Sequence, residues 1–351
     1  MKATGYFQAL PIEHKDALID LKLDKPVAAG RDILVKVAAV SVNPVDTKIR
    51  AAMASENDQP KIIGWDAVGE VVAVGEQVEL FNVGDQVWYA GDLTRSGSNA
   101  ELQLVDERIV GTKPNTLSNV EAAAMPLTAI TAWELLFDRL DFYPQLPAGL
   151  NKYESRVHTN PKEARLLIIG AAGGVGSILT QLAKQLTNAT VIGTASRPES
   201  ESWVKELGAD HVINHREPLV EQLHALGIND VTHVISLNHT DQHYEQLVEA
   251  LAPQGKLALI DDPQAPIDIM ALKLKSISLH WEFMYTRSMF ATHDIQQQHT
   301  LLTLLAQLID QGRIKTTLGE NYGTINAENL KRAHAHIESN TAVGKVVLEG
   351  F

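Results

Sequence analysis

Hydrophobic and polar residues alternate in short runs over the first 125 positions, and this pattern predicts β-strands. The runs are rich in valine and isoleucine and cover residues 33–42, 68–75 and 83–89. Glycine, asparagine and aspartate separate them, as in a compact β unit with tight turns. Between residues 120 and 140 alanine and leucine dominate, and Trp133, Leu136 and Leu140 recur three or four positions apart. That spacing predicts a helix.

From residue 164 onward, short apolar runs alternate with amphipathic segments of helical period. We expect strands at residues 165–169, 190–194, 211–214, 231–236, 256–261 and 276–283, and helices at 175–186, 199–207, 219–226 and 242–251. Strands that alternate with helices at this spacing predict a parallel sheet with both faces covered. The polar segment 141–163 has no period and predicts a surface loop. The end of the chain predicts a helix at 297–311 and a strand at 345–349.

A glycine-rich turn joins the first of these strands to the first of these helices. Residues 166–176 read LLIIGAAGGVG. Gly173 lacks a Cβ where a backbone must approach a pyrophosphate, and Gly176 lets the helix pack closely on the strand. The helix N-terminus adds N–H groups and the positive end of its dipole. We predict a dinucleotide site at Gly173, Gly174, Val175 and Gly176; an ordinary strand–helix turn is the alternative.

The end of the second strand indicates which dinucleotide binds. An NAD enzyme usually carries Asp or Glu there for the ribose 2′-hydroxyl. Here the chain reads ASRP over residues 195–198, and no carboxylate follows until Glu199. The hydroxyl of Ser196 and the guanidinium of Arg197 suit a 2′-phosphate. The sequence therefore predicts NADPH, with a solvated arginine in a turn as the alternative.

Several segments carry a resemblance that spans nearly the whole chain. They are SVNPVDTKIR (41–50), GWDAVGEVVAVG (64–75), AAAMPLTAITAW (122–133), GAAGGVG (170–176), ELGADHVINH (206–215) and GKVVL (344–348). In this order they resemble the medium-chain dehydrogenase/reductase superfamily, and within it the zinc-independent quinone oxidoreductase-like branch, also described as zinc-type alcohol dehydrogenase-like.

The resemblance implies an α/β fold in which a doubly wound Rossmann domain is inserted into a GroES-like β domain. It implies a GroES-like catalytic and substrate domain from residues 1–128 and 286–351. It also implies a Rossmann NADPH-binding domain from residues 129–285, and a homodimer formed through the sixth Rossmann strand at 276–283.

The chain contains no cysteine, which excludes disulfides and thiolate metal sites. The resemblance places Asn43 where the zinc-dependent branch has a cysteine ligand, and Trp65 where it has a histidine. We therefore expect no zinc, while Mg²⁺ or Ca²⁺ bound by scattered carboxylates stays open. Without a Lewis acid, the feasible chemistry is hydride delivery from NADPH to an electron-poor acceptor. A quinone or an α,β-unsaturated carbonyl fits that description.

The resemblance gives two candidate catalytic residues. Asn43 faces the nicotinamide and could donate a hydrogen bond to the substrate carbonyl, or else it only forms a turn before Pro44. Thr128 could bind the nicotinamide carboxamide, cap a helix, or do both. Asp46 is interpreted as structural, part of a packed turn.

The proton donor is left open. Several relatives carry a tyrosine two residues after Asp46, where this chain has Lys48. Tyr89, Tyr285 or water could supply the proton instead. Further cofactor contacts are implied by position alone, at Asn214, His215, Leu237, Ile260 and Lys345.

Charge and composition narrow the partners. The chain has 351 residues, 30 basic and 43 acidic side chains and a net charge of −13, which argues against nucleic acid and anionic membranes as partners. No apolar run is long enough to span a membrane and no signal peptide is recognisable, so we expect a cytoplasmic protein. His334 and His336 lie on a polar segment and are expected to be solvated.

Two rival functions stay open beside the reduction of quinones or enones. One is an NADPH-dependent reductase of a specific enoyl or carbonyl substrate. The other is a non-catalytic NADPH-binding sensor.

Overall fold

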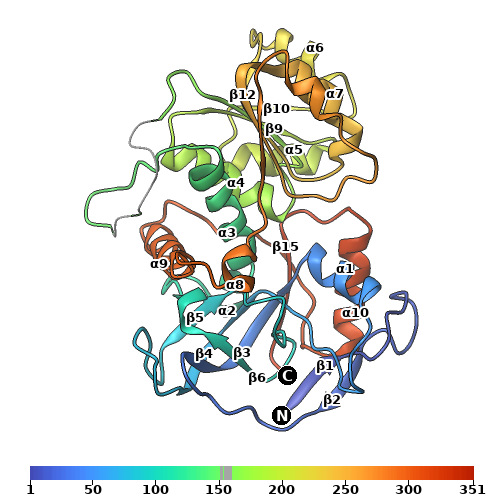
Figure 1. Cartoon of the computed structure of the whole chain (residues 1–351), viewed down its shortest axis with the longest axis vertical. Helices are drawn as coiled ribbons and strands as arrows, with labels where there is room; N and C mark the ends of the chain where they lie inside the picture. Colours follow the sequence, from blue (N-terminus) through green and yellow to red (C-terminus); the bar gives the residue numbers. More distant parts are fainter. Residues whose placement is uncertain (151–152, 154–159) are drawn as a thin grey trace. The chain divides into compact units, whose positions relative to one another are not determined.

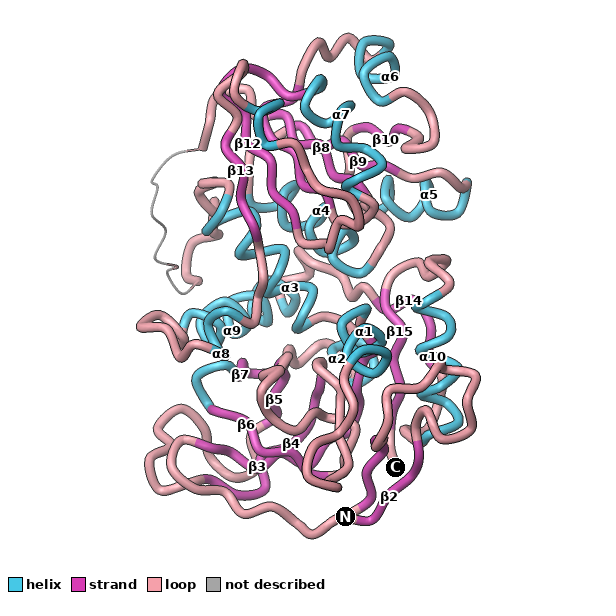
Figure 2. Tube along the Cα trace, turned by 45° about the vertical axis from the view of Figure 1, so that its right-hand side comes forward, coloured by secondary structure: helices cyan, strands magenta, loops and turns pink. Residues whose placement is uncertain are grey.

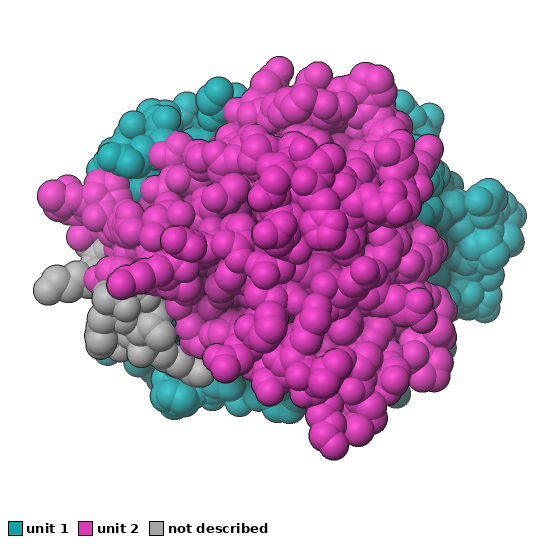
Figure 3. Space-filling model, turned by 90° about the horizontal axis from the view of Figure 1, so that it is seen from above, with its two compact units in different colours: residues 1–130, 285–351 teal, residues 131–284 magenta. Residues whose placement is uncertain are grey.

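The computed structural model describes residues 1–150, 153 and 160–351. The chain folds into two compact units (Figure 3). Unit 1 contains residues 1–130 and 285–351, and unit 2 contains residues 131–284. The expected loop at 141–163 has no regular element among its described residues, and residues 151–152 and 154–159 of it lie outside the described part.

Unit 1 is built on a largely antiparallel sheet of seven strands (Figure 1). Its strands are β3 (Asp32–Val42), β4 (Ala67–Val74), β5 (Gln86–Tyr89), β6 (Leu102–Asp106), β7 (Val110–Thr112), β14 (Leu318–Asn321) and β15 (Lys345–Glu349). β15 pairs antiparallel with β3, with Val346 opposite Val42. This register brings the start of the last strand beside the end of β3, although about 300 residues separate them in the sequence. A separate hairpin-like pair joins β1 (Lys2–Gly5) to β2 (Ile19–Lys22).

The helices of unit 1 follow or precede these strands. They are α1 (Pro44–Ala52), α2 (Asn119–Ala123), α8 (Thr286–Met289), α9 (Gln297–Asp310) and α10 (Ala327–Glu338), with a 3₁₀ turn η1 (Glu107–Ile109). α1 begins directly after β3 with proline at its first position, where the missing N–H costs nothing.

The helix expected over residues 120–140 is interrupted. The structure has α2, then α3 (Pro126–Trp133), then a π-helical turn η2 (Glu134–Arg139). Pro126 has no N–H to donate and disfavours helical geometry at Met125, so α2 ends before it and a new helix starts at the proline. The chain passes from unit 1 to unit 2 within α3.

Unit 2 contains a parallel sheet of six strands in the order β10-β9-β8-β11-β12-β13 (Figure 2). The strands are β8 (Arg165–Ile169), β9 (Thr190–Thr194), β10 (His211–Ile213), β11 (Val231–Ser236), β12 (Leu251–Leu259) and β13 (Ser278–Trp281). Four consecutive residues of β8, from Leu166 to Ile169, are buried. Because successive side chains point to opposite faces, both faces of the sheet are covered, as expected.

The helices of unit 2 are α4 (Gly174–Leu186), α5 (Pro198–Glu206), α6 (Leu219–Ala225) and α7 (Thr240–Ala250), with a 3₁₀ turn η3 (Ile269–Leu272). The alternation of strands and helices confirms the doubly wound prediction. No helix in the described residues is long and apolar enough to cross a membrane.

Three predictions about individual segments need correction. β13 covers only Ser278–Trp281, whereas the sequence predicted residues 276–283. β12 begins at Leu251 and ends at Leu259, whereas the sequence predicted residues 256–261. His334 was expected in solvent, but its side chain is fully buried on the inner face of α10. Burial and the nearby charge of Arg50 lower the pKa of His334 to about 3. It is a neutral core residue.

Candidate functional site

The glycine-rich turn of unit 2 has the shape that a phosphate cradle requires. Gly170 directly follows β8 and has a φ of +80°, a conformation that favours glycine. Gly173 is the N-cap of α4, and a Cβ there would meet nothing closer than the Gly170 oxygen at 3.5 Å. A Cβ on Gly176 would lie 2.4 Å from that same oxygen. Gly176 therefore permits the close approach of helix and strand, and Gly173 leaves open space at the helix N-terminus.

The turn is also held by a residue that sequence reasoning missed. Thr194, the last residue of β9, accepts the N–H of Gly170 through its Oγ1 at 3.0 Å. β8 and β9 are parallel neighbours, so the end of one strand supports the loop after the other. The sequence shows only a threonine at the end of a buried strand, and many threonines in that position do not bond a neighbouring loop.

The other predicted cofactor residues lie at the same edge of the sheet. Ser196 and Arg197 follow β9, and Asn214 and His215 follow β10. Leu237 and Ile260 come directly after β11 and β12. Since all six strands run parallel, their carboxyl ends share one edge, and the strand order reverses between β8 and β11. Ligands of such sheets bind outside this edge at the reversal point.

Arg197 and two histidines near this edge have neighbours that affect their charge. Arg197 is the N-cap of α5, and its guanidinium lies 3.4 Å from the carboxylate of Glu199. The rings of His215 and His243 are 6.1 Å apart. Burial and the neighbouring histidine charges lower the pKa of both imidazoles. Both are therefore neutral at physiological pH.

Two predicted residues of unit 1, Asn43 and Lys345, form a buried polar cluster with Asp66, a residue that the sequence analysis did not single out; we call it the lysine cluster. The Nζ of Lys345 donates to the Oδ1 of Asn43, to Oδ2 of Asp66 at 3.0 Å and to the Val42 carbonyl at 3.5 Å. The amide nitrogen of Asn43 donates to Oδ2 of Asp66 at 2.9 Å and to the Trp65 carbonyl at 3.2 Å. All three members are at most 3% exposed.

Thr128 directly follows Leu127, whose backbone N–H is bonded to Asp66 of the lysine cluster. Oδ1 of Asp66 accepts the N–H of Leu127 at 2.7 Å, in the first turn of α3. The hydroxyl of Thr128 donates to the Met125 carbonyl at 3.1 Å. The side chains of Asn43, Thr128 and Lys345 thus each have a partner inside unit 1.

Asp46 is the third residue of α1 and lies in its first turn. Its Oδ2 accepts the backbone N–H of Asn43 at 2.6 Å, which closes the turn between β3 and α1. Burial raises the pKa of this carboxyl to about 7; the hydrogen bond from Asn43 and the charge of Lys345 oppose that rise. The cluster region therefore contains two carboxyl groups but one ammonium; the ammonium is bonded to Asp66, and Asp46 is about half protonated near pH 7.

The two candidate tyrosines differ in their surroundings. Tyr89 is fully buried, and its hydroxyl donates to Oε1 of Gln103 at 2.8 Å. Tyr285 is 2% exposed, and burial together with Asp46 and Asp66 raises its pKa well above the usual value. Both phenols are protonated at physiological pH.

The residues at the zinc-ligand positions do not fit zinc. Asn43 is fully engaged in the lysine cluster, and the indole of Trp65 donates its N–H to the Asp92 carbonyl at 3.1 Å. An indole offers no lone pair to a metal, and the ammonium of Lys345 already neutralises Asp66. Within residues 1–150, 153 and 160–351, no three histidine, aspartate or glutamate side chains come together to hold a metal ion.

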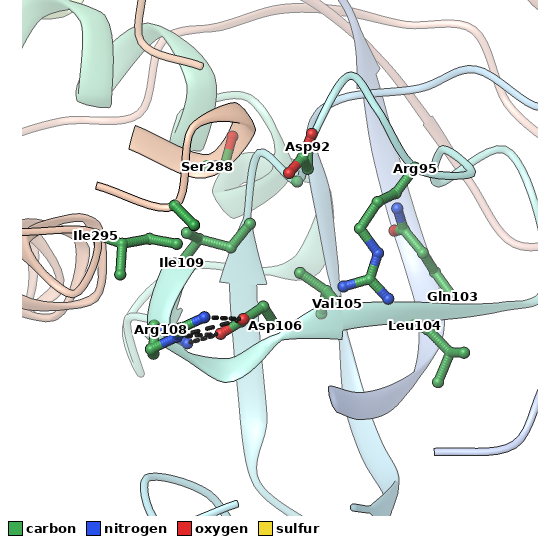
Figure 4. A pocket seen from close by; sticks show the side chains of 12 residues that line it. Asp92, Arg95, Gln103, Leu104, Val105, Asp106, Arg108, Ile109, Ser288 and Ile295 are labelled. Carbon is green, nitrogen blue, oxygen red and sulfur yellow. Dashed lines mark hydrogen bonds and ion pairs between the residues drawn. The ribbon is translucent and has the colours of Figure 1, made fainter. Parts of the chain in front are cut away.

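A small cavity of about 150 Å³ lies in unit 1, beside the loop that Trp65 contacts (Figure 4). Its wall includes Asp92, Arg95, Asp106 and Arg108 together with apolar side chains. Arg108 is bonded to Asp106, and Arg95 makes two bonds to Asp32 at 2.7 and 2.8 Å. Both arginines of the wall are therefore paired with a carboxylate.

Comparison with known proteins gives the same family at both ends of the chain. Residues 29–115 match the alcohol dehydrogenase GroES-like domain, and residues 207–348 match the zinc-binding dehydrogenase family. A zinc-type alcohol dehydrogenase-like protein of Staphylococcus aureus (strain COL) is 39% identical in an alignment of 351 positions that covers 99% of each chain. The 2-methylene-furan-3-one reductase of Solanum lycopersicum is 34% identical over 229 residues, 62% of this chain and 52% of that protein.

Solved structures extend the similarity over the whole chain. A candidate zinc-dependent alcohol dehydrogenase from Rhizobium etli CFN 42 is 52% identical, with a TM-score of 0.92, and the match covers 100% of this chain and 98% of that one. The quinone oxidoreductase of Escherichia coli, solved with NADPH, is 24% identical with a TM-score of 0.81, covering 99% of this chain and 100% of that one. At 24% identity, the similarity to the Escherichia coli structure shows the fold alone.

The raised pKa of Asp46 gives a prediction for stability. Between its usual pKa of 3.8 and about 7 the unfolded chain loses this proton while the folded chain keeps it. The contribution of protonated Asp46 to the free energy of unfolding is therefore present in full below its usual pKa and is lost as the pH rises toward 7. Relative to Asp46→Asn, the wild type should therefore lose up to about 1.4 kcal/mol of unfolding free energy per pH unit. Urea unfolding of both proteins between about pH 4.5 and about pH 7 measures this pH dependence of the unfolding free energy.

The matched control is Asp24→Asn, which removes an exposed carboxyl of the same unit. Its stability should follow the wild type with pH. Parallel curves for wild type and Asp46→Asn would contradict the assignment.

Proposed function

Because the chain belongs to the medium-chain dehydrogenase/reductase superfamily, in its quinone oxidoreductase-like branch, we propose that this oxidoreductase delivers a hydride from NADPH to a quinone or an α,β-unsaturated carbonyl compound without zinc. The observation that carries the proposal is the lysine cluster. An ammonium is bonded to the very residues that stand at and beside the zinc-ligand positions. A protein that keeps its dinucleotide turn but has no ligand set for zinc retains only the chemistry of its cofactor.

The glycine turn of unit 2 supports the cofactor assignment. NADPH, when bound, supplies the hydride. Gly173 and Gly174 would present backbone N–H groups and the N-terminus of α4 to the pyrophosphate. Arg197, with Ser196, would receive the 2′-phosphate, and Asn214 and His215 would lie beside the adenosine. Leu237 and Ile260, at the ends of β11 and β12, would lie nearer the nicotinamide end.

The acceptor must accept a hydride without a metal at its oxygen. Quinones and enones do so, because the negative charge that develops is delocalised or needs only hydrogen-bond donors. Asn43 and Thr128 are our candidates for contact with substrate and nicotinamide. A substrate oxygen would compete with Asp66 for the amide hydrogen of Asn43, since that hydrogen already has an internal acceptor.

Protonation of the reduced acceptor has two sources that fit the structure. Tyr285 is protonated and belongs to the same unit as Asp46 and Asp66. Water is the other source, because a reduced quinone or an enolate takes a proton from solvent. Tyr89 fits less well, since its hydroxyl is bonded to Gln103 in the core.

The sixth strand of unit 2 supports a homodimer. β13 is the edge strand of the sheet. Trp281 and Phe283 are about half exposed, whereas Glu282 between them is buried, with an oxygen 2.7 Å from Nε of Arg139. A strand end that exposes aromatic residues on one face is typical of an interface. We propose that a second copy of the chain pairs along this edge.

The acceptor is tested by following the consumption of NADPH with simple quinones, with enones including exocyclic methylene ketones, and with saturated ketones. We expect turnover with the first two classes and little or none with saturated ketones, whose carbonyl accepts a hydride less readily and benefits more from a Lewis acid. Enone turnover without quinone turnover would favour a specific enoyl reductase. Tight NADPH binding without turnover on any acceptor would contradict the proposal and favour a sensor.

Cofactor choice is tested with Arg197→Asp. The change replaces the proposed ligand of the 2′-phosphate by a like charge, so NADPH binding should weaken by at least about a hundredfold while NADH binding changes little. Fluorescence titration with each cofactor measures both constants. Arg313→Asp, the same charge change at an exposed site of unit 1, should leave both constants unaltered. Equal loss of NADPH and NADH binding in Arg197→Asp would contradict the assignment.

A further inference from the structure

Lys345 carries a buried positive charge whose hydrogen-bonding capacity is used inside unit 1. An ammonium has three hydrogens. In this structure they point to three oxygens, from the side chains of Asn43 and Asp66 and from the backbone of Val42. The side chain is 3% exposed. A lysine satisfied in this way has no hydrogen left for a cofactor phosphate or carboxamide.

Asp66 depends on that charge. Its side chain is fully buried, and burial raises its pKa while the charge of Lys345 opposes the rise. Loss of one member of a buried ion pair leaves the other uncompensated, which is far more costly than loss of an exposed pair. Lys345 and Asp66 therefore depend on each other and act as one ion pair.

Asp66 transmits the position of this pair to a helix. Its Oδ1 accepts the N–H of Leu127 at 2.7 Å, in the first turn of α3. A negative charge at a helix N-terminus is favourable because it meets the positive end of the helix dipole. The next residue is Thr128, and α3 carries the chain from unit 1 into unit 2.

We propose that Lys345 is a positioning residue of the reductase. Its ammonium fixes the amide of Asn43 and the carboxylate of Asp66, and through Asp66 it fixes the first turn of α3 with Thr128. The inference deepens the proposed function and rests on it. It replaces the expectation that Lys345 contacts the cofactor, because the lysine acts on both candidate catalytic residues from within unit 1.

The main test uses Lys345→Ala with chemical rescue. The substitution removes three carbons and the ammonium, which is the composition of n-propylammonium. Four quantities are measured on the full chain: the Kd of NADPH, turnover of an enone, the melting temperature, and hydrogen exchange of the Leu127 amide. Lys36→Ala removes an exposed lysine from β3 of the same unit and is the matched control.

We expect Lys345→Ala to reduce turnover by about tenfold to a hundredfold, the range of a lost charged hydrogen bond. The Kd of NADPH should change less than about threefold, since the glycine turn and Arg197 are untouched. The Leu127 amide should exchange faster. n-Propylammonium should restore turnover and protection in a saturable manner, whereas n-propanol should not.

Other outcomes overturn the inference. Weaker NADPH binding in Lys345→Ala with unchanged maximal turnover would identify Lys345 as a cofactor contact. Wild-type turnover together with wild-type exchange at Leu127 would show that the lysine positions nothing. Rescue by n-propanol as well as n-propylammonium would show that volume matters and charge does not.

Two further variants cover the case in which Lys345→Ala does not fold. Lys345→Arg keeps the charge, and should bind NADPH normally with reduced turnover because a planar guanidinium cannot reproduce the three bonds. Asp66→Asn should lower turnover at an unchanged Kd of NADPH; wild-type turnover in it would contradict the inference. Failure of the wild type to reduce any acceptor would instead refute the proposed function, and the exchange of Leu127 would still decide whether Lys345 fixes α3.

Discussion

The ion pair between Lys345 and Asp66 holds together segments that are far apart in the sequence. It joins the last strand, the end of β3, the start of β4 and the first turn of α3. A buried charge tolerates few arrangements, because each oxygen and each hydrogen must find a partner at once. The pair therefore specifies one geometry for the residues around it, and Asn43 is fixed by bonds to both members.

The same constraint relates the chain to its zinc-type relatives. In the resemblance, Asn43 and Trp65 stand at metal-ligand positions, and in the structure both have partners that exclude ligation. Lys345 supplies a positive charge to Asp66 from inside the protein. A second carboxyl, Asp46, lies in the same region, and burial raises its pKa to about 7, so its negative charge is reduced near neutral pH.

Unit 2 shows how much a local pattern can predict. The strands at residues 165–169, 190–194 and 231–236 match the expected limits, because each is an apolar run bounded by turn residues and is buried on both faces. The glycine at position 176 could also be interpreted from the sequence, because any Cβ there would collide with the backbone of the preceding turn. Short strands with polar, half-exposed residues, such as β2 and β14, carry no such pattern and were not predicted.

The lysine cluster could not be derived from the sequence in the same way. Lys345 and Asn43 meet only because β15 pairs with β3 in one register, and nothing local in GKVVL indicates that the lysine points into the core. His334 illustrates the same limit, since a polar helix concealed a histidine that is fully buried. Interactions between distant segments depend on the assembled sheet, whereas the fold class depends on patterns within single segments.

We propose that this oxidoreductase transfers its hydride without zinc, with the ammonium of Lys345 holding Asn43 and Asp66 in place. Metal analysis of the purified protein, combined with enone turnover before and after treatment with a strong chelator, tests it most directly. We expect zinc far below one equivalent per chain and turnover unaffected by the chelator. Stoichiometric zinc whose removal abolishes turnover, and whose return restores it, would contradict this proposal.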